Sequence, residues 1–174
     1  MGGTPPSLFR KGPTMAAILL LAIALAVVLV VRWSKAADDA VSMKGDAPPA
    51  DPQPLSFYMA RADATRGEAY FSRCSACHTA AQGGPNSIGP NLYGVMGGQM
   101  AARPDFNYSS ALRAKGGSWD WESVNSFLLR PRYFVPGTKM TFAGVSDPQN
   151  RADVMLYLNQ QGGNLTPPAP VAAR

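Results

Sequence analysis

The chain has 174 residues, of which 46% are hydrophobic, and a formal net charge of +5 from 16 Lys and Arg residues against 11 Asp and Glu residues. A chain of this length rarely divides into two independent cores, so we expect one globular domain. The charge excess is modest and no nucleic-acid-binding motif accompanies it, which argues against a nucleic-acid-binding protein.

The N-terminal part of the chain contains a long apolar stretch. Residues 12–31 include no charged side chain, and a helix of this length spans about 30 Å, enough to cross a bilayer. A cleaved signal peptide is the alternative, but its apolar run is usually about 7–15 residues and ends in small residues, whereas this run is followed by Arg32 and a Trp. We therefore expect an uncleaved transmembrane anchor over residues 14–33, after a short cytoplasmic N-terminus, residues 1–13.

Two segments of the chain offer few apolar side chains to bury. Residues 34–60 are rich in Ala, Pro and Asp, and residues 163–174 are rich in Pro and Ala. Such segments cannot offset their ordering entropy by burial. We expect a flexible linker over 34–60, a disordered tail over 163–174, and the globular domain between them, at 61–162.

The globular domain contains helical signals and almost no strand signal, which predicts an all-α fold. Asp63 and Asp147 can cap helices, Asp120 lies with a Glu as negative charge at the start of another, and a short helix is expected near residues 109–115. The last helix also has Pro148 in its first turn and Gly162 just after its end. The loops between them are long and rich in Gly and Pro, so a domain this small needs a further group at its centre. The predicted helices begin at or after Asp63, Ser109, Asp120 and Asp147.

The segment CSACH holds both cysteines of the chain and its only histidine, at Cys74, Cys77 and His78. Zinc needs four ligands and too few are at hand, while a redox dithiol needs a βαβ pattern that is not visible. A disulfide between these cysteines closes too small a loop to add much stability. Covalent haem attachment explains all three residues, because both thiols add to the porphyrin vinyl groups and the adjacent histidine binds the iron.

A second axial ligand cannot be another imidazole, because the chain has one histidine. Met140 is the methionine that we expect to bind the iron, since Pro136 and Gly137 hold its approach in an extended loop. An open or differently filled position is the alternative. Met96, Met100 and Met155 are expected to fill the core, as methionines commonly do.

Several segments together resemble the class I cytochrome c family, mitochondrial-type members above all, over nearly all of the globular domain. They are GEAYFSRCSACH, GGPNSIGPNLYG, FNYSSAL, the Trp119 segment, RPRYFVPGTKM followed by TFAGV, and RADVMLYL. The resemblance implies a small class I cytochrome c fold of about four to five helices around one covalent haem c, added here to one N-terminal transmembrane helix.

The resemblance also implies roles for individual residues. The thioether anchors are Cys74 and Cys77, and the axial ligands are His78 and Met140. A second set supports the haem: the Pro90 carbonyl orients the histidine ring, Tyr108 and Trp119 donate to a haem propionate, and Phe142 lies beside the exposed haem edge. For Tyr108 and Trp119, aromatic core packing is the alternative.

Three departures from the family pattern stand out. Gly98 replaces an arginine that binds a haem propionate in many members, so that charge is missing or comes from Arg103. Phe127 replaces a common tyrosine that faces the haem. Ser146 and Asp147 stand where lysines are usual, which thins the basic docking ring.

Two axial ligands from the protein leave no open coordination position, so we expect an electron-transfer protein rather than an enzyme. The resemblance implies a membrane-tethered carrier that transfers one electron at a time. Its donor is expected to be a quinol-oxidising cytochrome bc complex. Its acceptor is expected to be either a terminal cytochrome c oxidase of the haem–copper type or a photosynthetic reaction centre. The alternatives are a fixed cytochrome subunit of an oxidase or dehydrogenase complex and a ligand-sensing or peroxidase-type haem protein.

The basic residues near the ends of these motifs and the apolar stretch suggest how such a carrier meets its partners. Docking is expected through Arg73, Arg132 and Lys139, because such carriers place a basic ring around the haem edge. Haem attachment of this type takes place outside the cytoplasm. We therefore expect a single-pass protein of the bacterial inner (cytoplasmic) membrane, with its haem domain in the periplasm.

Overall fold

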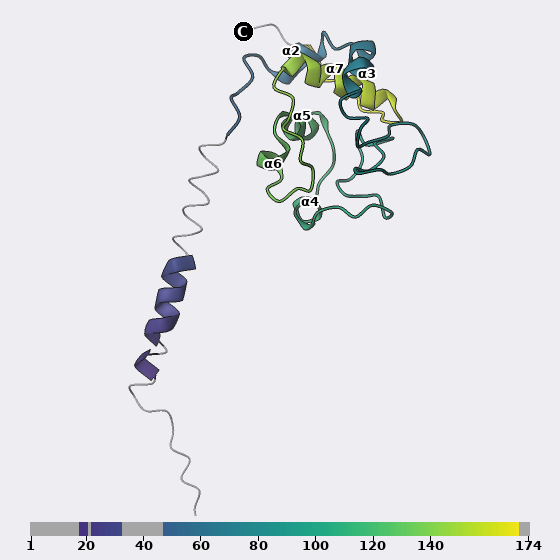
Figure 1. Ribbon diagram of the computed structural model, residues 1–174. Helices are drawn as coiled ribbons and strands as arrows, with labels where there is room; N and C mark the ends of the chain where they lie inside the picture. The colour runs from purple at the N-terminus through teal and green to yellow at the C-terminus, as the bar shows by residue number, and fades with distance from the viewer. Residues whose placement is uncertain (1–17, 21, 33–46, 171–174) are drawn as a thin grey trace, which may run out of the picture. The chain divides into compact units, whose positions relative to one another are not determined.

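The computed structural model of the chain describes residues 18–20, 22–32 and 47–170 (Figure 1). The chain divides into two units, residues 1–46 and 47–174. In the first unit, residues 18–20 and 22–32 are helical. No helix within the described residues combines the length and the apolar character that a membrane crossing requires. The predicted anchor extends past those residues at 14–17, 21 and 33, and the predicted N-terminus, 1–13, lies outside them.

The second unit is built from short helices joined by long loops. Over residues 47–170 the backbone contains six helices and no strand, apart from one isolated bridge between Gln99 and Ser118. The predicted all-α class is therefore confirmed for this part of the chain, which has two more short helices, α2 and α6, than the four whose starts were predicted. In chain order the helices are α2 (Leu55–Met59), α3 (Ala64–Phe71), α4 (Ser110–Lys115), α5 (Trp121–Leu129), α6 (Pro131–Phe134) and α7 (Pro148–Gln160).

The four predicted helix starts are confirmed by side-chain caps. Asp63 accepts a hydrogen bond from the N–H of Arg66 at 2.9 Å, at the start of α3. At the starts of α4, α5 and α7, the cap side chain likewise accepts a hydrogen bond from the backbone N–H three residues later, at 3.1, 2.7 and 2.8 Å. Each cap satisfies a backbone donor that the first turn leaves free. The other caps are Ser109, Asp120 and Asp147.

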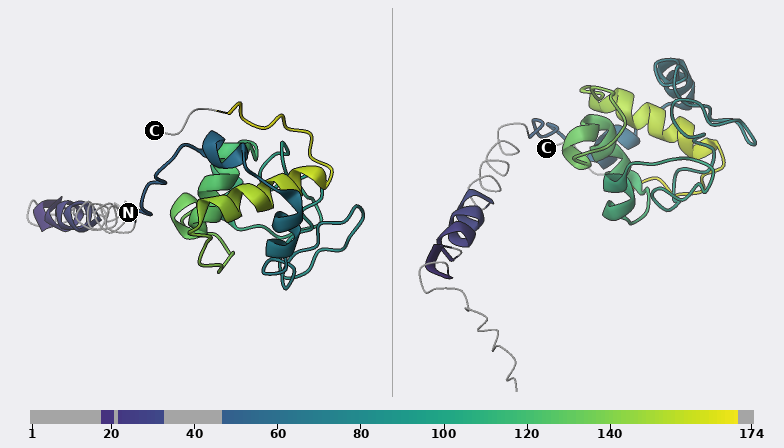
Figure 2. Two further views of the ribbon diagram at one scale, coloured as in Figure 1. Left: turned by 90° about the horizontal axis from the view of Figure 1, so that it is seen from above. Right: turned by 60° about the horizontal axis from the view of Figure 1, so that its bottom comes forward.

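Helices α3 and α7 cross in close contact (Figures 1 and 2). Gly67 lies at the crossing, where a Cβ atom would be 2.1 Å from the backbone oxygen of Asp153. One turn further on, the rings of Phe71 and Tyr157 are 5.3 Å apart and tilted. The absence of a side chain at Gly67 therefore allows the two backbones to approach.

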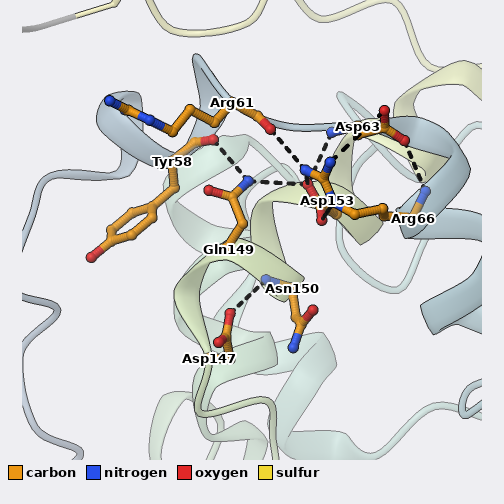
Figure 3. Close-up of polar contacts among 8 residues, drawn as sticks. All are labelled: Tyr58, Arg61, Asp63, Arg66, Asp147, Gln149, Asn150 and Asp153. Carbon is orange, nitrogen blue, oxygen red and sulfur yellow. Dashed lines mark hydrogen bonds and ion pairs between the residues drawn. The ribbon is translucent and has the colours of Figure 1, made fainter.

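A carboxylate of α7 joins this helix to the start of α3 (Figure 3). The side chain of Asp153 is 2% exposed. It accepts hydrogen bonds from Arg66 Nε at 2.7 Å and Nη2 at 2.9 Å, from the Asp63 N–H at 2.9 Å, and from Gln149 Nε2 at 3.0 Å. These bonds outweigh burial, so the pKa of Asp153 lies below its ordinary value.

The predicted linker, residues 34–60, is wrong at its C-terminal end. Helix α2 forms within it and packs on α7. Its apolar side chains, Leu55, Tyr58 and Met59, recur at helical spacing and are buried, so burial supplies the free energy that orders this segment. Residues 34–46 of the predicted linker lie outside the described residues.

The predicted disordered tail, residues 163–174, is wrong at its beginning. The Asn159 side chain exchanges two hydrogen bonds with the backbone of Leu165, at 3.0 and 3.1 Å. Trp121 Nε1 donates to the carbonyl oxygen of Thr166 at 2.9 Å. These partners lie on α7 and α5, so tertiary contacts order a segment whose composition indicates none. Residues 171–174 lie outside the described part of the chain.

Candidate functional site

The second unit contains a cavity of about 710 Å³. Its wall is formed by the loops between α3 and α4 and between α6 and α7, together with side chains of α5 and α7. All the residues predicted from the sequence to hold or support a cofactor line this one cavity: Cys74, Cys77, His78, Pro90, Tyr108, Trp119, Met140 and Phe142.

The cysteine pair lies on the turn that follows α3. The N–H of Cys74 donates to the carbonyl of Phe71 at 2.7 Å, and the carbonyl of Cys74 accepts from Cys77 at 3.0 Å and from His78 at 2.9 Å. Both cysteines are free and half-buried. Burial raises the pKa of the Cys74 thiol, and the neighbouring Cys77 raises it further. A raised pKa disfavours the thiolate that a redox or nucleophilic cysteine requires.

The imidazole of His78 is oriented by the next loop. Its Nδ1 is 2.7 Å from the carbonyl oxygen of Pro90, so Nδ1–H donates and Nε2 keeps its lone pair. Burial lowers the pKa of His78, and the Pro90 carbonyl offsets part of this effect. The ring is therefore neutral at neutral pH, which is the form that binds a metal.

Asn91, which the sequence analysis did not single out, holds the loop after His78 in place. It is 3% exposed. Its Nδ2 donates to Thr79 Oγ1 at 2.6 Å and to the Ala81 carbonyl at 2.9 Å, and its Oδ1 accepts from the Tyr93 N–H at 3.0 Å. The sequence shows only that this Asn directly follows Pro90, and its burial cannot be predicted from the pattern.

Arg103 is the half-buried cation of the cavity wall. Its Nη2 donates to Asn91 Oδ1 at 2.8 Å and to the Tyr93 carbonyl at 2.7 Å. Gly98, which stands where many members of the similar family have an arginine, lines the same cavity. Arg103 therefore supplies a positive charge to the same cavity wall in which Gly98 carries none.

Met140 reaches the cavity on the loop after α6. The N–H of Thr138 donates to the Val135 carbonyl at 3.0 Å, Gly137 has a φ of 88°, and the N–H of Met140 donates to Thr138 Oγ1 at 3.2 Å. Lys139 Nζ donates to the carbonyl of Asn107 at 2.8 Å and so joins this loop to the loop before α4. The Met140 side chain is half-buried.

Aromatic side chains form much of the remaining wall. Trp119 is buried and packs on Phe127 and Phe134, at ring distances of 5.1 and 6.4 Å. Tyr108 packs edge-on against Phe106 at 4.9 Å. Burial raises the pKa of Tyr108, and Arg103 offsets part of the effect.

The predicted docking residues are all exposed. Arg73 and Lys139 lie at the rim of the cavity, whereas Arg132 lies on α6, away from the cavity wall.

The site itself combines two thiols, a neutral imidazole and a thioether on a largely aromatic and aliphatic wall. Within residues 18–20, 22–32 and 47–170, no three His, Cys, Asp or Glu side chains group as a metal cluster. Two free thiols beside a largely apolar wall fit an apolar cofactor that is attached through both cysteines.

Comparison with known proteins decides the identity of this cofactor. A profile described as cytochrome c matches residues 64–162, more than half of the chain. The chain belongs to the cytochrome c family. Proteins of this family carry covalently attached haem c and transfer electrons, which confirms the predicted cofactor and identifies the cytochrome c domain as an electron-transfer domain rather than an enzyme.

Two curated relatives and one solved structure illustrate the similarity. A "cytochrome c homolog" of Bradyrhizobium diazoefficiens is 44% identical over 117 residues, which cover 67% of this chain and 64% of that protein. A "cytochrome c2" of Agrobacterium tumefaciens is 40% identical over 99 residues, 55% of this chain and 89% of that protein. The structure of cytochrome cH from Methylobacterium extorquens has 38% identity and a TM-score of 0.53, and covers 56% of this chain and 98% of that one. The chain thus spans less than two thirds of the Bradyrhizobium protein.

Proposed function

We propose that the protein is a membrane-tethered one-electron carrier whose haem is attached through Cys74 and Cys77 and ligated by His78 and Met140. The observation that carries the proposal is that His78 and Met140, from loops far apart in sequence, line the same cavity as the cysteine pair. When bound, the haem supplies a one-electron ferric–ferrous couple. A methionine ligand and an apolar wall both favour a potential higher than that of a bis-imidazole site.

The surroundings of the two proposed ligands support electron transfer over ligand sensing or peroxidase chemistry. Pro90 fixes the ring of His78. Met140 is held by its own turn and by the bond from Lys139 to Asn107 on the facing loop. A methionine held in this way occupies the position that a diatomic ligand or peroxide would need. Little reorganisation of these residues is then required when the charge of the site changes.

The tether rests on the uncharged stretch of residues 12–31, which is long enough to cross a bilayer as a helix. We place the anchor at residues 14–33 in the bacterial inner membrane, with residues 1–13 in the cytoplasm and the cytochrome c domain in the periplasm. A tethered domain searches a small volume, so it meets neighbouring complexes at a high effective concentration. Weak docking then suffices, in agreement with the thinned basic ring at Ser146 and Asp147.

The proposed electron donor is a quinol-oxidising cytochrome bc complex, and the proposed acceptor is a terminal haem–copper oxidase or a photosynthetic reaction centre. Arg73 and Lys139 give the cavity rim exposed positive charge, and Arg132 adds a further exposed charge on α6. An acidic partner surface would therefore steer toward the rim.

A reconstitution experiment tests the proposal. The full-length holoprotein is placed in vesicles with a purified bc complex and a quinol, and its reduction is followed optically with and without a bc inhibitor. The matched variant lacks residues 1–33 and is exported by a cleavable signal so that it still acquires haem. We expect inhibitor-sensitive reduction of both proteins, faster for the full-length protein when the vesicles are dilute.

Four outcomes would contradict parts of the proposal. Reduction that is insensitive to the inhibitor would exclude the bc complex as donor. Equal rates for the two proteins in dilute vesicles would remove the role of the tether. Carbon monoxide binding to the untreated ferrous protein at neutral pH would show that Met140 does not hold the sixth position. Co-purification with an oxidase or dehydrogenase at high salt would instead identify a fixed subunit.

A further inference from the structure

Arg151 of α7 is a charged side chain that is completely buried, with an exposed fraction of 0%. Its Nε donates to Asn125 Oδ1 on α5 at 2.7 Å. Its Nη1 donates to the backbone carbonyls of Val145 at 2.6 Å and Ser146 at 3.0 Å. A buried guanidinium is stable only when its hydrogen bonds are satisfied and its charge is neutralised.

The neutralising charge comes from a distant part of the chain. Arg151 Nη2 forms an ion pair with Asp51 Oδ2, whose side chain is 19% exposed. Asp51 precedes residues 64–162, the part that matches the cytochrome c family profile. The matched part of the chain therefore contains a buried cation whose counter-charge is supplied by a segment that precedes it, residues 51–59, called here the N-terminal segment.

This N-terminal segment is fastened to α7 at a second place as well. Helix α2 buries Leu55, Tyr58 and Met59, and Gln149 Nε2 donates to the Tyr58 carbonyl at 3.2 Å (Figure 3). Gln149 also donates to Asp153, which ties the segment to the hydrogen bonds at the start of α3. Asp51 is thus held against α7 by the fold rather than by the ion pair alone.

The two carbonyls bound by Arg151 belong to the segment that follows Met140. Val145 is 2% exposed, and its N–H donates to the Leu128 carbonyl at 2.8 Å. Gly144, with a φ of 113°, lies so close to α5 that a Cβ would be 2.1 Å from the Leu129 carbonyl oxygen. Residues 144–146 therefore form the fixed C-terminal end of the loop that carries Met140. The hydrogen bonds from Arg151 are among the contacts that hold this end in place.

We propose that the N-terminal segment positions Met140: Asp51 neutralises Arg151, and Arg151 holds the carbonyls of Val145 and Ser146, which keeps the methionine loop closed over the cavity. This inference rests on the proposed role of Met140 as an iron ligand. Asp51 is a positioning residue, since it acts through Arg151 and lines no part of the cavity. The end of the linker and the methionine side of the site are then energetically coupled.

Exogenous imidazole tests this coupling, because it binds ferric haem only after Met140 has left the iron. The full-length ferric holoprotein in detergent is titrated with imidazole at neutral pH, and unfolding in guanidinium is measured on the same samples by far-UV circular dichroism. Asp51→Asn keeps the side-chain volume and removes the charge. The matched control is Asp63→Ala, which loses the cap of α3 and contacts neither Arg151 nor the methionine loop.

We expect Asp51→Asn to bind imidazole about tenfold more tightly than the wild type, because loss of a charged hydrogen bond eases opening of the loop. Asp63→Ala should unfold at lower denaturant and bind imidazole within about twofold of the wild type. Equal imidazole affinities of Asp51→Asn and the wild type, or equal shifts in both variants, would overturn the inference. A wild type without methionine ligation in its oxidised spectrum would refute the proposed function instead.

Discussion

Gly89 lies against the imidazole ring of His78, where a Cβ atom would be 2.2 Å from Cε1 and 2.6 Å from Nδ1. The ring cannot retreat without losing its 2.7 Å contact with the carbonyl of Pro90. A residue without a side chain is therefore required beside the proposed ligand, for steric reasons alone.

Substitution of this glycine should be destabilising. Gly89→Ala is expected to lower the free energy of unfolding by about 1–3 kcal/mol, as overpacking commonly does, and to shift the visible spectrum because the ring moves. The control is Ser87→Ala in the same loop, where the side chain is exposed. Denaturant titration and optical spectra check both variants. A Gly89→Ala protein as stable as Ser87→Ala would show that the loop accommodates the added methyl group without cost.

The crossing of α3 and α7 predicts a second intolerant glycine. Gly67→Ala would place a Cβ 2.1 Å from the Asp153 carbonyl oxygen, a backbone atom that cannot rotate away. We expect a loss of about 3 kcal/mol, measured by guanidinium unfolding, with the haem still attached. Thr65→Ala, at an exposed position of the same helix, should leave stability nearly unchanged. A loss no larger than that of Thr65→Ala would contradict the close packing.

The hydrogen bonds to Asp153 predict a pH-dependent contribution to stability. Because folding lowers the pKa of Asp153, its contribution is fully present above the ordinary carboxyl pKa of about 4 and is lost as the pH falls through the lowered value. Asp153→Asn should therefore be less stable than the wild type at neutral pH, and the difference should shrink below about pH 4. Unfolding curves across this range measure it, with Thr65→Ala as a variant whose difference stays flat. A difference for Asp153→Asn that stays constant down to low pH would argue against these bonds.

The proposed methionine ligand predicts the direction of a potential change. Met140→His replaces a thioether by an imidazole, which stabilises ferric iron, so the midpoint potential should fall by on the order of 100 mV or more. Equilibrium redox titration of the purified holoprotein measures this. The control is Met155→Leu, at a methionine that is 0% exposed in the core and does not line the cavity. An unchanged midpoint in Met140→His would mean that this side chain does not bind the iron.

The sequence predicted those features whose causes are local. The caps Asp63, Asp120 and Asp147 act within three residues of themselves, so the helices that follow them were visible from the pattern. The cysteine pair and His78 are likewise adjacent in the chain, and their chemistry depends on their spacing.

Features whose causes lie far away in the chain were not predicted. Residues 51–59 look like linker by composition, and their order comes from burial on α7 and from the pair between Asp51 and Arg151. Asn91 carries no sequence sign of its burial. Leu165 and the residues near it are ordered by bonds to Asn159. In each case the stabilising partner is set by the tertiary fold.

The near-infrared absorption spectrum of the oxidised full-length protein at neutral pH tests the central claim most directly. Ligation by His78 and Met140 predicts the weak charge-transfer band from a methionine sulfur to ferric iron, and its loss in Met140→His. A wild-type spectrum without that band would show that Met140, although it lines the cavity, does not complete the site.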